Sequence, residues 1–235
     1  MSKRREGLSI IFPAYNEEAN LEAVIKRTAD VMSEVTDDWE IIVVDDGSTD
    51  GTAEIIDSFR TLGERFKAIH HPMNRGYGAA LKSGIINAKK DLIFFCDSDL
   101  QFDIREIDKL LDWIDAYDIV IGYRAKRQDP YYRRLNAFGW NMLMRFVLGL
   151  KIRDIDCAFK IFRREVFDRI NIEAVGAMVN ADILAKALKL KFTLKEVPVT
   201  HYPRLKGKQT GAKLRVILKA FGELITLSRK LKLYQ

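Results

Sequence analysis

Residues 91–99 read DLIFFCDSD, and this stretch decides how the chain is organised. The apolar run from Leu92 to Cys96 indicates a buried strand. Side chains at positions i and i+2 of an extended chain point the same way, so Asp97 and Asp99 can converge just past the strand's end. Open α/β sheets bind ligands at that edge, and two carboxylates there suit a hard divalent cation. Taken alone, the same three residues are more typical of an acidic strand-to-loop turn.

Three further polar turns follow apolar runs in the same half of the chain. They read PAYNE at residues 13–17, DDGSTDG at 45–51 and NRGYGAA at 74–80. Each alone is compatible with ordinary turn chemistry, because Asp, Asn, Gly and Ser are turn formers. Since the carboxyl ends of parallel strands meet at one edge of a sheet, all four turns can build one site. Their recurrence at successive strand ends favours a ligand site.

The first half of the chain alternates strand and helix. We expect strands at residues 8–12, 40–45, 66–71, 91–96 and 118–122, and helices at 19–35, from about 50, at 79–88 and at 104–115. In the second half we expect helices at 136–148 and 181–190, strands at 159–162 and 193–199, and an amphipathic helix at 212–231. This order predicts an α/β fold with a Rossmann-like, mostly parallel central sheet flanked by helices and followed by the C-terminal amphipathic helix.

Composition and charge narrow the classes of function. The chain has 235 residues, 48% of them apolar and 31% charged, which is typical of a globular protein. No uncharged stretch exceeds ten residues, so none could span a membrane, and no secretory leader follows Met1. Cys96 and Cys157 have no metal or disulfide spacing, which indicates a reducing cytosol. The net charge of +6 suits an anionic membrane or a phosphorylated substrate, and no nucleic-acid-binding motif accompanies it.

These motifs resemble the family 2 glycosyltransferases, which have the GT-A fold, and within them the dolichyl- and polyprenyl-phosphate mannose or glucose synthases. The resemblance extends from residue 8 to about residue 216 and is most specific in the first half. The second-half match reads RRLNA at 133–137, LGL at 148–150, DIDCAFK at 154–160 and EVPV at 196–199. It implies a GT-A domain over residues 1–211, divided into a nucleotide-sugar half (1–122) and an acceptor half (123–211), with the amphipathic helix at 212–235.

The resemblance assigns a set of residues to the sugar donor. The nucleotide-sugar-binding residues would be Pro13, Tyr15, Glu17, Asp45, Asp46, Arg75, Asp97, Ser98, Asp99, Arg204 and Lys206. Asp45 or Asp46 would accept hydrogen bonds from the base or ribose. Arg204 and Lys206 belong to a basic loop at residues 202–211 that would close over the diphosphate. The alternative is a solvated surface loop.

The resemblance also implies a metal. Asp97 and Asp99 would hold Mg²⁺ or Mn²⁺, with Gln101 as a third ligand two residues further on the same side. The metal would neutralise the diphosphate as it leaves.

A second set of residues would handle the acceptor. Arg124, Arg133 and Arg134 match the positions that grip the acceptor's phosphate, a task that suits arginine. Asp154, or alternatively Asp156, matches the acidic residue that the family places near the acceptor. The expected catalytic residues are therefore Asp154, Asp156 and Asp99. A hydroxyl acceptor needs a general base, whereas a phosphate monoester is already a nucleophile at neutral pH. The alternative is that Asp154 is a structural residue that pairs with Arg153 or Lys160.

Two departures from the family pattern leave the lipid acceptor open. Ala137 stands where Ser is common, and Cys157-Ala158-Phe159-Lys160 replaces Ser-Gly-Phe-Arg. The resulting expectation is a metal-dependent, inverting transferase of a hexose from a donor such as GDP-mannose or UDP-glucose to a polyprenyl or dolichyl phosphate. It would lie on the cytoplasmic face of a membrane and bind no nucleic acid. The alternatives are a family 2 enzyme acting on a sugar hydroxyl in an envelope polysaccharide and a non-catalytic nucleotide-sugar-binding module. The oligomeric state stays open.

Overall fold

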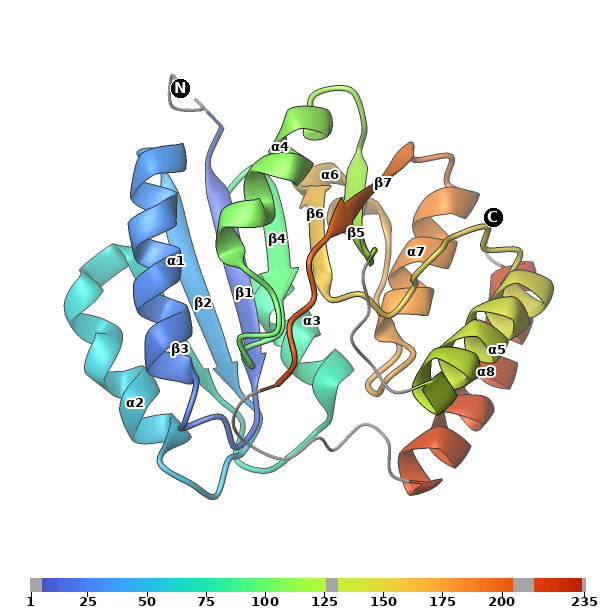
Figure 1. Ribbon diagram of the computed structural model, residues 1–235, viewed down its shortest axis with the longest axis horizontal. Coiled ribbons are helices and arrows are strands. Elements are labelled where there is room, and N and C mark those ends of the chain that lie inside the picture. Colours follow the sequence, from blue (N-terminus) through green and yellow to red (C-terminus); the bar gives the residue numbers. More distant parts are fainter. Residues whose placement is uncertain (1–5, 126–130, 205–213, 234–235) are drawn as a thin grey trace.

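One seven-stranded sheet organises the molecule (Figure 1). The computed structural model describes residues 6–125, 131–204 and 214–233. The strands are β1 Leu8–Ala14, β2 Trp39–Asp45, β3 Phe66–His70, β4 Leu92–Cys96, β5 Ile119–Arg124, β6 Phe159–Arg163 and β7 Leu194–Val199, in the spatial order β3-β2-β1-β4-β6-β5-β7. Strand β6 runs antiparallel to its neighbours β4 and β5, and the other pairs are parallel. The expected mostly parallel sheet is confirmed.

The central strands are apolar on both sides because helices cover both faces of the sheet. In β2, Ile42 and Val44 belong to the hydrophobic cluster on one face, whereas Ile41 and Val43 belong to the cluster on the other. Strand β4 divides its side chains in the same alternating way. Side chains of successive residues point to opposite faces, so a continuous apolar run fills both layers of core.

The helices form the outer layers. They are α1 Leu21–Val35, α2 Thr52–Ser58, α3 Tyr77–Asn87, α4 Asp108–Ile114, α5 Tyr131–Leu148, α6 Arg164–Arg169, α7 Val179–Lys189 and α8 Leu214–Leu233. Helices α1, α2 and α4 contribute to the core on one face of the sheet, and α3, α6 and α7 to the core on the other. Helices α5 and α8 lie side by side beyond α7, at the right of Figure 1, where Trp140 meets Phe221 edge to face at 5.5 Å.

Three short elements differ from the sequence-based expectation. A single helix was expected over residues 104–115, but Ile104–Ile107 form a 3-10 turn and α4 follows it. The chain is tighter there because the side chain of Asp103 accepts a hydrogen bond from the amide of Arg105. Helix α6 and the 3-10 segment Phe59–Arg65 were not expected. Both are too short to show a helical period.

Candidate functional site

The turns after β1 and β2 are joined to each other by hydrogen bonds. The amide of Asn16 donates to Ser48 Oγ at 2.9 Å, and Asn16 Oδ1 accepts from the amide of Thr49 at 2.8 Å. Asn16 has a φ of 56°, a left-handed conformation that Asn tolerates better than most residues. The two motifs therefore form one surface, on which the Tyr15 side chain is exposed.

The turn after β4 is attached to the same surface. Ser98 is buried and donates from its Oγ to the carbonyl oxygen of Pro13 at 3.0 Å. This bond connects the ends of β1 and β4, which are neighbours in the sheet. Pro13 and Ser98, both expected to bind the donor, thus hold the two strand ends together.

Asp45 and Asp46 are buried and engaged by the protein. Asp46 accepts from the amides of Arg75 at 2.9 Å and Gly76 at 2.7 Å, and its Oδ1 lies 2.7 Å from His71 Nδ1. Asp45 accepts from the amide of Ser48 at 2.9 Å, and His70 lies 3.2 Å away. Asp46 therefore orders the turn before α3, a role that was not expected from the sequence. The Arg75 residue that this turn carries is exposed.

The signal for this arrangement was present in the sequence as two adjacent pairs. Asp45-Asp46 ends β2 and His70-His71 ends β3, and these strands are parallel neighbours. His71 also lies 2.9 Å from Ser83 Oγ on α3 through its second ring nitrogen. The side chain of each histidine therefore contacts the aspartate that lies next to it on the neighbouring strand.

Asp97 and Asp99 lie together beyond β4, as expected. Burial, and after it the negative charge of Asp99, raises the pKa of Asp97 to about 7. Burial likewise raises the pKa of Asp99. Leu100 has a φ of 60°, which is strained for an L residue with a large side chain and turns the chain sharply after the two carboxylates. Two desolvated carboxylates in one turn are a site that a cation would stabilise.

Gln101 is held in place from the other end of the chain. Its backbone amide donates to Asp99 Oδ1 at 3.1 Å, and its side-chain Nε2 donates to the carbonyl oxygen of Tyr202 at 3.0 Å. The amide of Tyr202 donates back to the carbonyl oxygen of Gln101 at 2.8 Å. The segment after β7 is therefore fixed beside the Asp97–Asp99 turn.

Arg204 continues this segment into the site. Its Nη2 lies 2.6 Å from Glu17 Oε1, and its Nη1 lies 3.4 Å from Asp99 Oδ2. Glu17 also accepts from Asn20 Nδ2 at 2.9 Å, and burial raises its pKa. Three residues expected to bind the donor, Glu17, Asp99 and Arg204, are thus brought into direct contact. Lys206 lies outside the described residues.

Arg124 and Asp154, both expected on the acceptor side, contact each other. Arg124 makes a two-pronged contact with Asp154, from Nε to Oδ2 and from Nη2 to Oδ1, each at 2.7 Å. Asp154 is buried, whereas Asp156 is exposed. The charge of Arg124 acts to lower the pKa of Asp97, although burial outweighs it. Arg133 and Arg134 belong to α5, but their side chains fall outside the described part.

The oxygen donors of this site fit a hard divalent cation. Asp97, Asp99 and Gln101 supply carboxylate and amide oxygens at a turn that follows a strand end. Among the described residues, no three His, Cys, Asp or Glu side chains gather as a preformed metal cluster. A set of two carboxylates is what Mg²⁺ accepts when substrate phosphates complete its shell.

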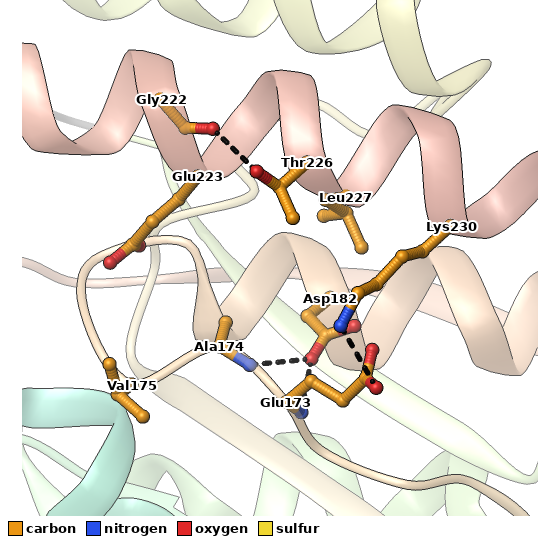
Figure 2. Close-up of a pocket in the computed structure, with 9 residues that line it drawn as sticks. All are labelled: Glu173, Ala174, Val175, Asp182, Gly222, Glu223, Thr226, Leu227 and Lys230. Carbon is orange, nitrogen blue, oxygen red and sulfur yellow. Dashed lines mark hydrogen bonds and ion pairs between the residues drawn. The ribbon is translucent and has the colours of Figure 1, made fainter.

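A cavity of about 440 Å³ lies elsewhere, between α8 and the segment before α7 (Figure 2). It is lined by Glu173, Ala174, Val175, Asp182, Gly222, Glu223, Thr226, Leu227 and Lys230, and contains none of the expected site residues. Asp182 accepts from the amides of Glu173 and Ala174, and Lys230 lies 3.2 Å from Glu173. The carbonyl oxygen of Val175 accepts from the amide of Ala79 at 3.2 Å, so this wall supports the start of α3.

Comparison with known proteins gives a consistent result. A family model described as glycosyl transferase family 2 matches residues 9–170. Undecaprenyl-phosphate 4-deoxy-4-formamido-L-arabinose transferase of Pectobacterium carotovorum is 35% identical over 164 residues, which cover 68% of this chain and 50% of that protein. Polyprenol monophosphomannose synthase of Mycolicibacterium smegmatis is 32% identical over 221 residues, which cover 88% of this chain and 82% of that protein. The chain spans about half the length of the arabinose transferases that it matches.

A solved structure supports the fold. Glucosyl-3-phosphoglycerate synthase from Mycobacterium tuberculosis, in complex with Mn²⁺, UDP and glucosyl-3-phosphoglycerate, superposes with a TM-score of 0.65 at 21% sequence identity. The match covers 97% of this chain and 77% of that one. The expected GT-A architecture and the expected family are confirmed, and the chain belongs to glycosyl transferase family 2.

Proposed function

We propose that this chain is an inverting glycosyltransferase that moves a hexose from a nucleotide diphosphate sugar to a polyprenyl phosphate. The observation that carries the proposal is the two-pronged contact through which buried Asp154 holds the Arg124 guanidinium at the end of β5. In this proposal Arg124 receives the acceptor phosphate there, while Asp97 and Asp99 hold the metal in the turn after β4. The names of the curated relatives, which are polyprenyl-phosphate and polyprenol sugar transferases, support the same acceptor class.

The donor side would bind the nucleotide through the joined turns. Tyr15 offers an exposed aromatic surface beside the base, and Glu17 offers a carboxylate for hydroxyl or N–H groups. When bound at Asp97, Asp99 and Gln101, Mg²⁺ or Mn²⁺ would neutralise the diphosphate as it leaves. Arg204 lies beside this position and would add a second positive charge, which matters most as charge develops on the leaving group. The structural relative was solved with UDP and Mn²⁺, which supports a donor and metal of this kind.

The acceptor side suits a phosphate better than a hydroxyl. Both oxygens of Asp154 are engaged by Arg124, so Asp154 orients a guanidinium for phosphate. A phosphate monoester has a second pKa of about 6 and attacks without a general base. A sugar hydroxyl would need a base, and exposed Asp156 is the candidate for that alternative.

The proposed lipid acceptor requires access to a membrane surface, and α5 and α8 offer one. Met142 and Phe146 are exposed on α5, and Phe221 and Ile225 are exposed on α8. Each pair is spaced four residues apart, so each lies on one helix face. No helix in the described part of the chain is both long enough and apolar enough to cross a membrane. We infer that the protein binds peripherally, on the cytoplasmic face.

The test is transfer of radiolabelled hexose into a lipid extract. Wild-type protein with Mn²⁺ is supplied with GDP-mannose or UDP-glucose and either polyprenyl phosphate, polyprenol or no lipid. Label that enters the lipid phase only with polyprenyl phosphate supports the proposal. Transfer to polyprenol, with loss of activity in Asp156→Asn, would favour the hydroxyl alternative. Nucleotide binding without transfer or donor hydrolysis would favour a binding module.

A further inference from the structure

Lys160 is a buried charged residue next to the site, and the proposed reaction so far gives it no role. It is the second residue of β6, opposite Phe95 of β4 and Ile121 of β5, and none of its surface is exposed. A lysine in a central strand is rare, because removing an ammonium group from water is costly unless its donors are satisfied. Such a residue in the core needs a reason.

The three N–H donors of Lys160 have three acceptors. Its Nζ donates to the carbonyl oxygens of Ile155, at 3.0 Å, and Cys157, and to Asn180 Oδ1 at 3.0 Å. An ammonium has three donors, so these contacts satisfy it fully. None of the ion pairs among the described residues involves Lys160. Its positive charge is therefore left to act on its surroundings.

The carboxylates of the site are the surroundings that this charge reaches. Burial lowers the pKa of Lys160, and the charges of Cys157, Asp156, Asp154 and Asp97 act in the opposite direction.

The same contacts fix a loop. Ile155 and Cys157 flank Asp156 and follow Asp154, and Asn180 lies in the first turn of α7. Lys160 thus ties the 154–158 loop to β6 and to α7. Because Asp154 holds Arg124 through two hydrogen bonds, the position of this loop sets the position of the guanidinium.

We propose that Lys160 is a positioning residue for the acceptor: through the 154–158 loop and Asp154 it places Arg124 to receive the acceptor phosphate. This inference rests on the proposed function. It explains why a lysine occupies a core position where burial of an apolar residue would cost less free energy. An apolar side chain would leave the carbonyl oxygens of Ile155 and Cys157 without the donor that locates them.

The test compares Lys160→Met with Ile161→Ala. Ile161 is the next residue of β6, is also fully buried and points to the opposite face, so its truncation weakens the same strand and removes no hydrogen bond to the loop. Steady-state kinetics are measured well below the melting temperature of each variant. We expect Lys160→Met to raise the KM for polyprenyl phosphate at least tenfold while the KM for the sugar donor stays within about twofold. Ile161→Ala should leave both constants near those of the wild type.

Two further measurements keep the inference falsifiable. If Lys160→Met does not fold, Asn180→Ala removes one acceptor and keeps the ammonium, and it should raise the acceptor KM selectively but less. If wild type does not use polyprenyl phosphate, the proposed function fails by itself. Hydrogen exchange at the amides of residues 155–158 then tests the positioning, with faster exchange expected in Lys160→Met than in Ile161→Ala. Unchanged acceptor KM in a folded variant, or unchanged exchange where transfer is absent, would overturn it.

Discussion

Arg204 Nη1 lies 3.4 Å from Oδ2 of Asp99, so an arginine cation faces a carboxylate that we propose as a metal ligand. The second arm of the guanidinium is held by Glu17 at 2.6 Å. A divalent cation that uses this oxygen of Asp99 must compete with Arg204. The donor diphosphate would relieve the competition by giving Arg204 a new anionic partner.

This competition predicts opposite effects of one substitution on metal and donor. Arg204→Met should bind Mn²⁺ more tightly than wild type without nucleotide, by about fivefold if the displaced contact contributes about 1 kcal/mol. With donor present, kcat should fall, because the contact with the diphosphate would strengthen in the transition state. Electron paramagnetic resonance titration of free Mn²⁺ measures the first effect. Arg105→Met, which removes an exposed arginine from the 3-10 turn Ile104–Ile107, should change neither quantity. Weaker Mn²⁺ binding by Arg204→Met would contradict the competition.

The paired carboxylates after β4 predict a metal-linked stability. A ligand that binds only the folded state raises the melting temperature by mass action. Mn²⁺ together with the nucleoside diphosphate should therefore stabilise wild type, and Asp97→Asn should abolish most of that rise. Asp99→Ala should remove turnover while the far-UV circular dichroism spectrum stays that of the wild type. Full activity in excess chelator, or an equal thermal shift in Asp97→Asn, would rule out this metal site.

Replacement of either of the two adjacent histidines at the end of β3 should lower the free energy of unfolding, but by different amounts. His71 is buried and lies between Asp46 and Ser83, whereas His70 is more exposed and contacts Asp45 and Asp57. Loss of a buried partner leaves unsatisfied groups that cost about 1–3 kcal/mol, while an exposed pair contributes about 0–1 kcal/mol. His71→Ala should thus lower the free energy of unfolding by about 1–3 kcal/mol, and His70→Ala by less than about 1 kcal/mol. Urea denaturation followed by tryptophan fluorescence compares them. Equal losses would show that the Asp46 network does not order the turn before α3.

Local patterns in the sequence were sufficient to predict the sheet and the meeting of its polar turns at one edge. The run at residues 41–44 is apolar on both faces, which is typical of a parallel strand between helix layers. Strand ends carry their turns to one edge, so the meeting of residues 13–17 with 45–51 follows from topology alone. Hydrogen bonds from Asn16 to Ser48 and Thr49 bear this out.

The partners of individual charges could not be predicted in the same way. Arg204 meets Glu17 across 187 residues of sequence, and Arg124 meets Asp154 across 30. Those pairings depend on where the segments after β5 and β7 cross the sheet edge, which no local period encodes. A lysine in a short strand reads as solvent-facing, yet Lys160 is fully buried because the 154–158 loop folds over it and supplies its acceptors.

The exposed apolar side chains of α5 and α8 predict membrane binding that can be removed without unfolding the protein. Phe146 is 82% exposed and Ile225 is 56% exposed, so their replacement removes little packing. The double variant Phe146→Glu/Ile225→Glu should retain its melting temperature and lose binding to phosphatidylglycerol vesicles. The two new carboxylates lie on an apolar face that is flanked by basic residues such as Arg145 and Arg229. We expect this face to contact anionic headgroups, which would repel the carboxylates.

The matched control for this prediction is Ile86→Glu, because Ile86 is 70% exposed on α3, away from α5 and α8. It adds the same charge and removes a similar apolar side chain, so its co-sedimentation with vesicles should equal that of the wild type. Each basic residue near an anionic surface contributes about 1 kcal/mol, so wild-type binding should weaken with added salt and on phosphatidylcholine vesicles. If the folded wild type shows no preference for anionic vesicles at low salt, or if the double variant binds as well as Ile86→Glu, the helices α5 and α8 do not form the membrane-facing surface.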